Sequence, residues 1–101
     1  MLAEFSIIPI GAGSSIGDRL AEVLRIVDAS GIPYKINPMG TVVEGEWDEV
    51  IRLIKKCHNT VMKTGERAVT TISIDDRKGK PKRIDQKVRS IEKRIGKALK
   101  K

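Results

Sequence analysis

Apolar positions change their spacing along the chain, and each change marks a new element. Residues 3–10 are mostly apolar without a helical period, which predicts a strand that is apolar on both faces. From residue 16 the apolar positions recur at helical spacing, and Gly31 follows as a typical C-terminal glycine. The side chains that define these elements are Phe5, Ile7, Ile8 and Ile10 in the strand and Ile16, Leu20, Val23, Leu24 and Val27 in the helix.

The middle of the chain predicts a hairpin followed by a second helix. Residues 34–37 and 41–44 are two short stretches joined by a turn at residues 38–40, a spacing typical of antiparallel strands. The next helix opens on acidic residues, which suit the positive end of the helix dipole, and Gly65 ends it. Its predicted buried stripe consists of Trp47, Val50, Ile51, Ile54, Cys57 and Val61.

The last third of the chain predicts one more strand and a basic helix. Residues 67–75 ("RAVTTISID") form the strand, and a loop rich in charge with Gly and Pro separates them from the helix. The apolar residues of this helix repeat every three or four positions, so we expect them to pack on the body of the domain. They are Ile84, Val88, Ile91, Ile95 and Leu99.

The order of these elements is β-α-β-β-α-β with one helix added at the end. We therefore expect an α+β fold, a ferredoxin-like sandwich with an antiparallel sheet and an additional C-terminal helix. A chain of 101 residues is one domain by its size. Within it, residues 1–79 form the core and residues 80–101 form the basic C-terminal helix.

The stretch "IIPIGAGSSIGDRL" looks like a dinucleotide-binding loop, but the element order argues against that function. Such a site needs helices that cross between parallel strands and an acidic residue about 20 positions after the glycines. Here the second strand returns directly as a hairpin and ends in Asn37. The spacing of Gly11, Gly13 and Gly17 also differs from the dinucleotide pattern. We interpret this loop as the entry to the first helix.

Charge is concentrated at the C-terminal end of the chain. Residues 1–76 hold eight Lys or Arg and eleven Asp or Glu, a net charge of −3. Residues 77–101 hold twelve basic and two acidic residues, a net charge of +10. The sequence has no apolar run of the roughly 20 residues that span a bilayer. Its first residues lack a basic segment and include Glu4, so we expect no secretion signal there. Cys57 and His58 are a poor ligand pair and a lone cysteine fits a reducing compartment, so we expect a cytoplasmic protein without a metal site.

Three segments carry a family resemblance: "AEFSIIPIG", "PYKINPMGTVVEGEWDEV" and "RAVTTISIDDRKG", with "PMGTVVEG" at residues 38–45 as the most specific. Over residues 3–79 the chain resembles the thiamine-binding (YkoF-like) protein family of small ferredoxin-like domains. The resemblance implies a non-catalytic protein that binds thiamine or its hydroxymethylpyrimidine part, as a ligand and not as a cofactor. It also implies a homo-oligomer in which sheets join across subunits.

Residues on the first strand and the hairpin suit such a ligand. Thiamine combines a cationic ring with an aminopyrimidine that donates and accepts hydrogen bonds, so its site should offer a carboxylate, short polar groups and an apolar wall. The candidate ligand-binding residues are Ser6, Asn37, Met39, Thr41 and Glu44. Structural explanations stay open for them, such as strand propensity for Thr41, turn chemistry for Asn37 and a solvated strand end for Glu44.

We expect a homodimer at the minimum and a homotetramer as the full assembly. The two core helices would cover one face of the sheet, and the first strand is apolar on the other face too. A nucleic-acid-binding module that uses the basic helix is the alternative function. Base-stacking platforms need exposed aromatic residues on the central strands, however, and "EFSIIPI" and "RAVTTISID" offer only Phe5. An enzyme is a third class, for which the sequence holds no Ser-His-Asp set; we expect neither nucleic acid nor a membrane as the main partner.

Overall fold

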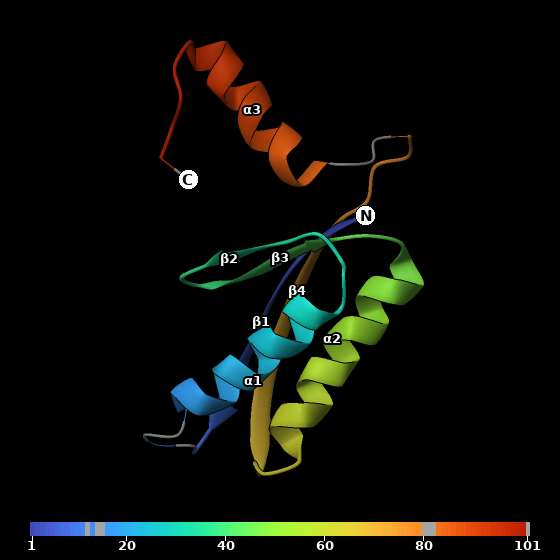
Figure 1. Cartoon of the computed structure of the whole chain (residues 1–101), viewed down its shortest axis with the longest axis vertical. Coiled ribbons are helices and arrows are strands. Elements are labelled where there is room, and N and C mark those ends of the chain that lie inside the picture. The colour runs from blue at the N-terminus through green and yellow to red at the C-terminus, as the bar shows by residue number, and fades with distance from the viewer. Residues whose placement is uncertain (12, 14–15, 80–82, 101) are drawn as a thin grey trace.

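The structure is a computed structural model that describes residues 1–11, 13, 16–79 and 83–100. Figure 1 shows its course from a sheet with two helices to a third helix that stands apart at the C-terminal end. The elements are β1 (Leu2–Ile10), α1 (Ile16–Ala29), β2 (Tyr34–Asn37), β3 (Gly40–Glu44), α2 (Trp47–Met62), β4 (Arg67–Asp75) and α3 (Arg83–Ile95). Each of these elements was predicted from the sequence, in this order.

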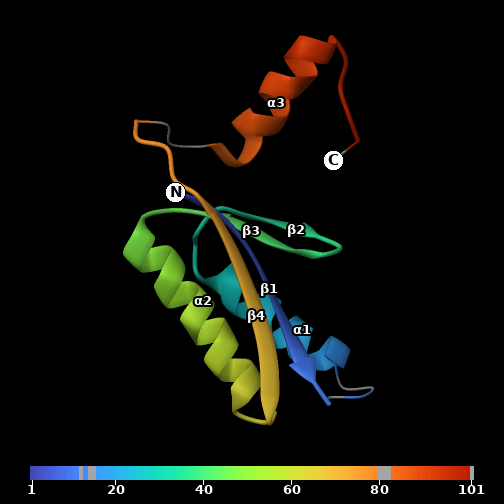
Figure 2. The same cartoon turned by 180° about the vertical axis from the view of Figure 1, so that it is seen from behind.

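The four strands form one antiparallel sheet in the order β2-β3-β1-β4. Both α1 and α2 lie on the same face of this sheet, which we call the helix face (Figure 1). Figure 2 views the molecule from behind, where β1 and β4 pass in front of the helices; we call this side the outer face. The arrangement confirms the predicted α+β fold, a ferredoxin-like sandwich with an additional C-terminal helix.

The core lies between the helix face and the two helices. β1 shows strand alternation, with Ala3, Phe5 and Ile7 buried against the helices. The predicted second apolar side of this strand is also present, since Ile8 and Ile10 lie on the outer face at 49% and 43% exposure. The helices complete the core with Val23, Val27, Val50, Leu53, Ile54, Cys57 and Val61.

The buried stripe of α2 differs from the prediction at its beginning. Trp47 is 53% exposed and Ile51 is only partly buried, whereas Leu53 belongs to the core. Trp47 is the first residue of the helix. The residues around it cap the helix end, and the Trp47 side chain does not pack into the core. The Glu46 N–H donates to Glu49 Oε1 at 2.7 Å in a capping box, so the acidic first turn does stabilise this helix end.

The C-terminal helix is where the structure departs most from the expectation that its apolar stripe packs on the body. Among the thirteen residues of α3, all of which are described, none is buried. Both views show α3 leaving the end of the sheet and diverging from it (Figures 1 and 2). The radius of gyration is accordingly 15.0 Å, compared with about 13 Å for a compact chain of this length. Polar contacts at the first turn of α3 set this direction.

Candidate ligand-binding site

β1 is longer than the hairpin beside it, and this mismatch creates a corner in the fold. β3 pairs with β1 only as far as Phe5, while β4 accompanies β1 to Ile10. From Ser6 onward, the edge of β1 on the side of β3 therefore has no paired strand among the described residues. The hairpin turns back at this level through Pro38 and Met39.

Gly40 allows the hairpin to approach β1 at this corner. A Cβ atom at this position would lie 3.0 Å from the carbonyl oxygen of Phe5, a distance at which something has to move. Glycine avoids this contact because it has no side chain. The end of the hairpin therefore stays close to the middle of β1.

A pocket with a volume of about 250 Å³ occupies the corner between β1, α1 and the β2–β3 hairpin. The described residues that line it include no charged side chain. Polar groups come from β1 and the hairpin, and α1 adds only apolar side chains. The apolar part of the lining includes Phe5, Ile7, Leu20, Val23, Leu24 and Ile36, and the polar part consists of Ser6, Asn37 and Thr41.

Four of the five predicted ligand-binding residues line this pocket: Ser6, Asn37, Met39 and Thr41. Thr41 is paired with Phe5 and lies on the helix face, where it is 7% exposed. Met39, in the turn, is 88% exposed, so little of its thioether side chain is used in packing. The structure therefore brings these four residues together, and their contact with a ligand stays a prediction.

Glu44 lies outside this pocket. It is three residues beyond Thr41 on β3, on the outer face, and only 8% exposed. Its carboxylate accepts hydrogen bonds from the backbone N–H groups of Arg83 at 2.5 Å and Ile84 at 3.2 Å. Glu44 thus caps the N-terminus of α3, and its predicted contact with a ligand stays untested.

Ion pairs strengthen this attachment of α3. Asp75, at the end of β4, contacts Arg83 Nη1 at 2.9 Å and Lys87 Nζ at 2.7 Å. These cations, Arg83 foremost, hold the pKa of the Asp75 carboxyl well below its ordinary value. On β2, Lys35 pairs with Asp85. The hairpin therefore carries both the lining of the pocket and part of the attachment of α3.

Sequence reasoning missed the apolar lining of the pocket, because Leu20 and Leu24 read as ordinary core positions of a helix. Both are only partly covered in the structure. A usable signal was present in the predicted lengths of the strands. The first strand spans residues 3–10, twice the length of each hairpin strand, so part of it had to extend beyond the hairpin.

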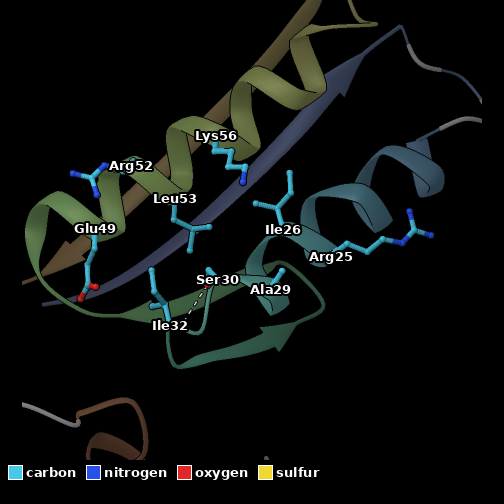
Figure 3. A pocket seen from close by; sticks show the side chains of 9 residues that line it. All are labelled: Arg25, Ile26, Ala29, Ser30, Ile32, Glu49, Arg52, Leu53 and Lys56. Carbon is cyan, nitrogen blue, oxygen red and sulfur yellow. Dashed lines mark hydrogen bonds between the residues drawn. The ribbon is translucent and has the colours of Figure 1, made fainter.

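A second hollow lies between α1 and α2 and is shown in Figure 3. Three of its lining residues are basic: Arg25, Arg52 and Lys56. Their charged ends point in different directions, with Arg25 turned away from the other two (Figure 3). An anion site needs donors that converge on one point. The hollow therefore lacks the geometry of a phosphate or carboxylate site.

Cys57 and His58 both serve the packing of α2. Burial raises the pKa of the Cys57 thiol to about 11, which keeps it protonated at neutral pH. The Nδ1 atom of His58 lies 2.6 Å from Oγ1 of Thr70 on β4.

Within the described ranges, no cluster of three His, Cys, Asp or Glu side chains could hold a metal ion. The described helices also include none with the length and apolar character needed to cross a membrane.

Fold and pocket together define a small ferredoxin-like α+β protein with a mainly apolar pocket beside its central strand. The sequence model of the family described as thiamine-binding protein matches residues 3–92, and the chain belongs to this family. The match continues past residue 79 and takes in most of α3.

Related proteins share nearly the whole chain. A UPF0045 protein from Methanocaldococcus jannaschii is 35% identical over 91 residues, which cover 90% of this chain and 91% of that protein. The UPF0045 protein YqgV of Bacillus subtilis is 34% identical over 100 residues, 93% of this chain and 96% of the relative. The similarity is therefore not confined to the segments around the pocket.

Solved structures share the fold. The crystal structure of a hypothetical protein from Methanocaldococcus jannaschii superposes with a TM-score of 0.82 at 36% identity, covering 89% of this chain and 93% of that one. A Thermotoga maritima protein, assigned provisionally to thiamine biosynthesis or salvage, gives a TM-score of 0.79 at 21% identity, covering 89% and 96%. At this identity the second likeness concerns the fold alone.

Proposed function

We propose that this protein is a non-catalytic binding protein for thiamine or its hydroxymethylpyrimidine part, and that the corner pocket is the binding site. The pocket itself carries the proposal, because it joins the short polar side chains of Ser6, Asn37 and Thr41 to an apolar wall. Such a lining suits a flat heteroaromatic ring with hydrogen-bonding groups at its edge. Membership of the thiamine-binding protein family supports the ligand class.

Charge and size favour the pyrimidine part over the whole thiamine molecule. A cationic thiazolium would require a carboxylate nearby, and the described lining has none. Glu44, the predicted carboxylate, is engaged by the first turn of α3. The volume of about 250 Å³ is also below the roughly 300–1,000 Å³ of typical ligand pockets. We therefore expect hydroxymethylpyrimidine to bind more tightly than thiamine diphosphate.

Titration calorimetry with hydroxymethylpyrimidine, thiamine and thiamine diphosphate tests this proposal. Thr41→Val removes one hydroxyl from the pocket and keeps the shape, so we expect roughly 2- to 12-fold weaker binding, the value of one hydrogen bond. Thr71→Val is the matched control, because Thr71 is exposed on β4 and does not line the pocket. Its affinity should equal that of the unchanged protein.

The proposal fails if none of the three compounds gives heat or a thermal shift. The corner pocket is not the binding site if Thr41→Val and Thr71→Val bind the ligand equally well. Tighter binding of thiamine diphosphate than of hydroxymethylpyrimidine would agree with a thiamine-binding function. It would indicate that the diphosphate group contacts the basic C-terminal segment.

We further propose that the protein is a homo-oligomer, with a dimer as the minimum and a tetramer as the full assembly. It would act in the cytoplasm in storage, delivery or sensing of its ligand. Support comes from the outer face of the sheet, where Ile8, Ile10 and Val69 are 49%, 43% and 42% exposed. A patch of this kind is typical of a contact surface. Light scattering should give at least twice the 11.2 kDa mass of the chain.

Nucleic-acid binding through the basic helix stays the second candidate. Its support is the net charge of +10 over residues 77–101, together with the separation of α3 from the body in Figure 1. Binding to phosphates weakens steeply as salt rises. A titration with an oligonucleotide at two salt concentrations therefore separates this function from binding in the uncharged corner pocket.

A further inference from the structure

The apolar stripe of α3 is covered at its beginning and open at its end. Ile84 and Val88 are partly buried near the sheet, whereas Ile91 and Ile95 are 51% and 56% exposed. These four side chains share one side of the helix by their spacing. Leaving two isoleucines in water is unfavourable, so the exposed half of the stripe is a surface that no described residue of its own chain covers.

The first turn of α3 is held too firmly for the stripe to turn back onto its own sheet. Glu44 accepts hydrogen bonds from the backbone of Arg83 and Ile84 on β3. Asp75 on β4 and Lys35 on β2 each hold a charged residue of the same turn. Contacts to three strands define the direction of a helix, and this direction leads away from the sheet (Figures 1 and 2).

The outer face of the sheet offers a surface that matches this stripe. It carries the exposed side chains of Ile8, Ile10 and Val69, which β1 and β4 place next to each other by their register. Along the same face, a shallow groove of about 290 Å³ runs between the strands and the base of α3. Its lining includes Leu2, Val42 and Ser73 together with the exposed carboxylate of Glu4.

Net charge is opposite between the C-terminal segment and the body of the chain. Residues 77–101 carry a net charge of +10, and residues 1–76 a net charge of −3. Arg94 lies between Ile91 and Ile95 in the sequence. On the outer face, Glu4 stands in the groove and Arg67 is paired with Ile10 in the strand register. A second α3 helix laid on this face would bring basic groups to an acidic body, which steers association. The same contact between two copies of α3 alone would oppose two strongly basic helices.

We propose that α3 is an exchanged arm: the stripe of one copy packs on the outer face of the sheet of a second copy, and the second copy returns the contact. This closed exchange covers both open apolar surfaces of each chain with one symmetric interface. It deepens the homo-oligomer proposed above and rests on that part of the proposal, not on the identity of the ligand. It also assigns a role to the helix whose basic composition the ligand function does not use.

Chemical cross-linking between two different copies tests the exchange. One copy carries Ile95→Cys in the arm and the other Ile8→Cys on the sheet, each with a tag of different mass, and a short bismaleimide joins neighbouring thiols. Cys57 can be kept because it is fully buried. We expect a covalent heterodimer. Lys93→Cys, which lies on the opposite side of α3 from the stripe, replaces Ile95→Cys in the control and should give none.

The mass of charge-matched variants provides the second test. The double change Ile91→Asp and Ile95→Asp alters the charge by −2, and so does the single change Lys93→Asp on the polar side. The first should lower the mass of the assembly, from a tetramer to a dimer or from a dimer to the 11.2 kDa chain, with its circular dichroism retained. The second should keep the mass of the unchanged protein. A stripe variant that keeps the oligomeric mass would overturn the exchange and leave a homo-oligomer formed by other surfaces.

Two further results would also overturn the proposal. The unchanged protein could run as an 11.2 kDa monomer, which would remove the homo-oligomer as well. A monomer that sediments with phosphatidylserine vesicles or binds an oligonucleotide through the stripe would assign α3 to an anionic partner instead. Ligand calorimetry is independent of these outcomes, so failure of the exchange and failure of the binding function are distinguishable.

Discussion

The body of the molecule and its C-terminal helix are both amphipathic, but only the body encloses its apolar residues. Val27, Val43 and Val50 are 0% exposed between the sheet and the two core helices. In α3, a stripe of equal regularity leaves Ile91 and Ile95 more than half exposed. Regular apolar spacing therefore predicts that a helix packs against something, but not against what. The polar contacts at the ends of a helix decide which way it points.

The β2–β3 hairpin belongs to both regions and links them. Its turn lines the corner pocket with Asn37 and Met39. Its other end holds α3 through Lys35 and Glu44. A substitution near the turn of the hairpin should therefore affect the pocket, and a substitution at its other end should affect the attachment of α3.

The largest contrast should come from matched truncations of one isoleucine in each region. Ile54 in α2 is 3% exposed and Ile95 in α3 is 56% exposed. Ile54→Ala leaves a cavity in the core and should lower the free energy of unfolding by about 2–5 kcal/mol. Ile95→Ala should change it by less than about 0.5 kcal/mol, as typical of surface positions. Urea unfolding, at a concentration low enough to give monomers, measures both values.

Equal losses for the two variants would contradict the comparison. They would place the end of α3 in a packed environment within its own chain. A loss at Ile95 that grows with protein concentration would instead agree with an arm that packs between copies, because assembly then contributes to the measured stability.

Most of the fold was predictable from the sequence because local signals agree with one another. The apolar run of residues 3–10 without a helical period and the short turn at Pro38 and Met39 indicate the sheet. The acidic residues at the start of α2 indicate where this helix begins. The position of α3 was not predictable. It depends on Glu44, 39 residues before Arg83, whose contact with the helix the spacing of apolar residues does not reveal, and on Asp75 at the end of the preceding strand.

The candidate site was predictable only in part, for a similar reason. The residue types of Ser6, Asn37 and Thr41 suit a pyrimidine ligand, and the structure brings them to one pocket. A carboxylate was expected with them, but the register of β3 places Glu44 on the opposite face from Thr41. Side chains three residues apart on one strand face opposite sides, so the spacing of Thr41 and Glu44 already separated them once both were placed on one strand.

A smaller effect should follow from removal of the carboxylate that caps α3. Glu44→Ala takes an acceptor from two backbone N–H groups, a loss worth about 0.5–2 kcal/mol at helix N-termini. We expect α3 to detach more often, with roughly 2- to 30-fold faster tryptic cleavage after Arg89. Glu22→Ala is the control, because Glu22 lies exposed on α1 and is not one of the described residues that hold α3 by a hydrogen bond or an ion pair. Unchanged cleavage in Glu44→Ala would show that the ion pairs alone hold the arm.

The smallest effect concerns pH and the ion pairs of Asp75. Arg83 and then Lys87 stabilise the ionised carboxyl, so the pKa of Asp75 in the folded chain lies below its ordinary value of 3.8. A depressed folded pKa means that the stabilisation is fully present above pH 3.8 and is lost as the pH falls below it. The arm should therefore stay attached from neutral pH down to about pH 4 and loosen only in stronger acid. The carboxyl carbon shift of Asp75, followed by NMR, gives the midpoint directly. Arg83→Met should raise that midpoint toward 3.8 by more than Lys87→Met does, since the Arg83 contact is the larger cause. If the Asp75 carboxyl of both variants titrates as it does in the unchanged chain, these ion pairs do not hold the arm. The cap by Glu44 is then what attaches α3, in contrast to the body, which apolar packing holds together.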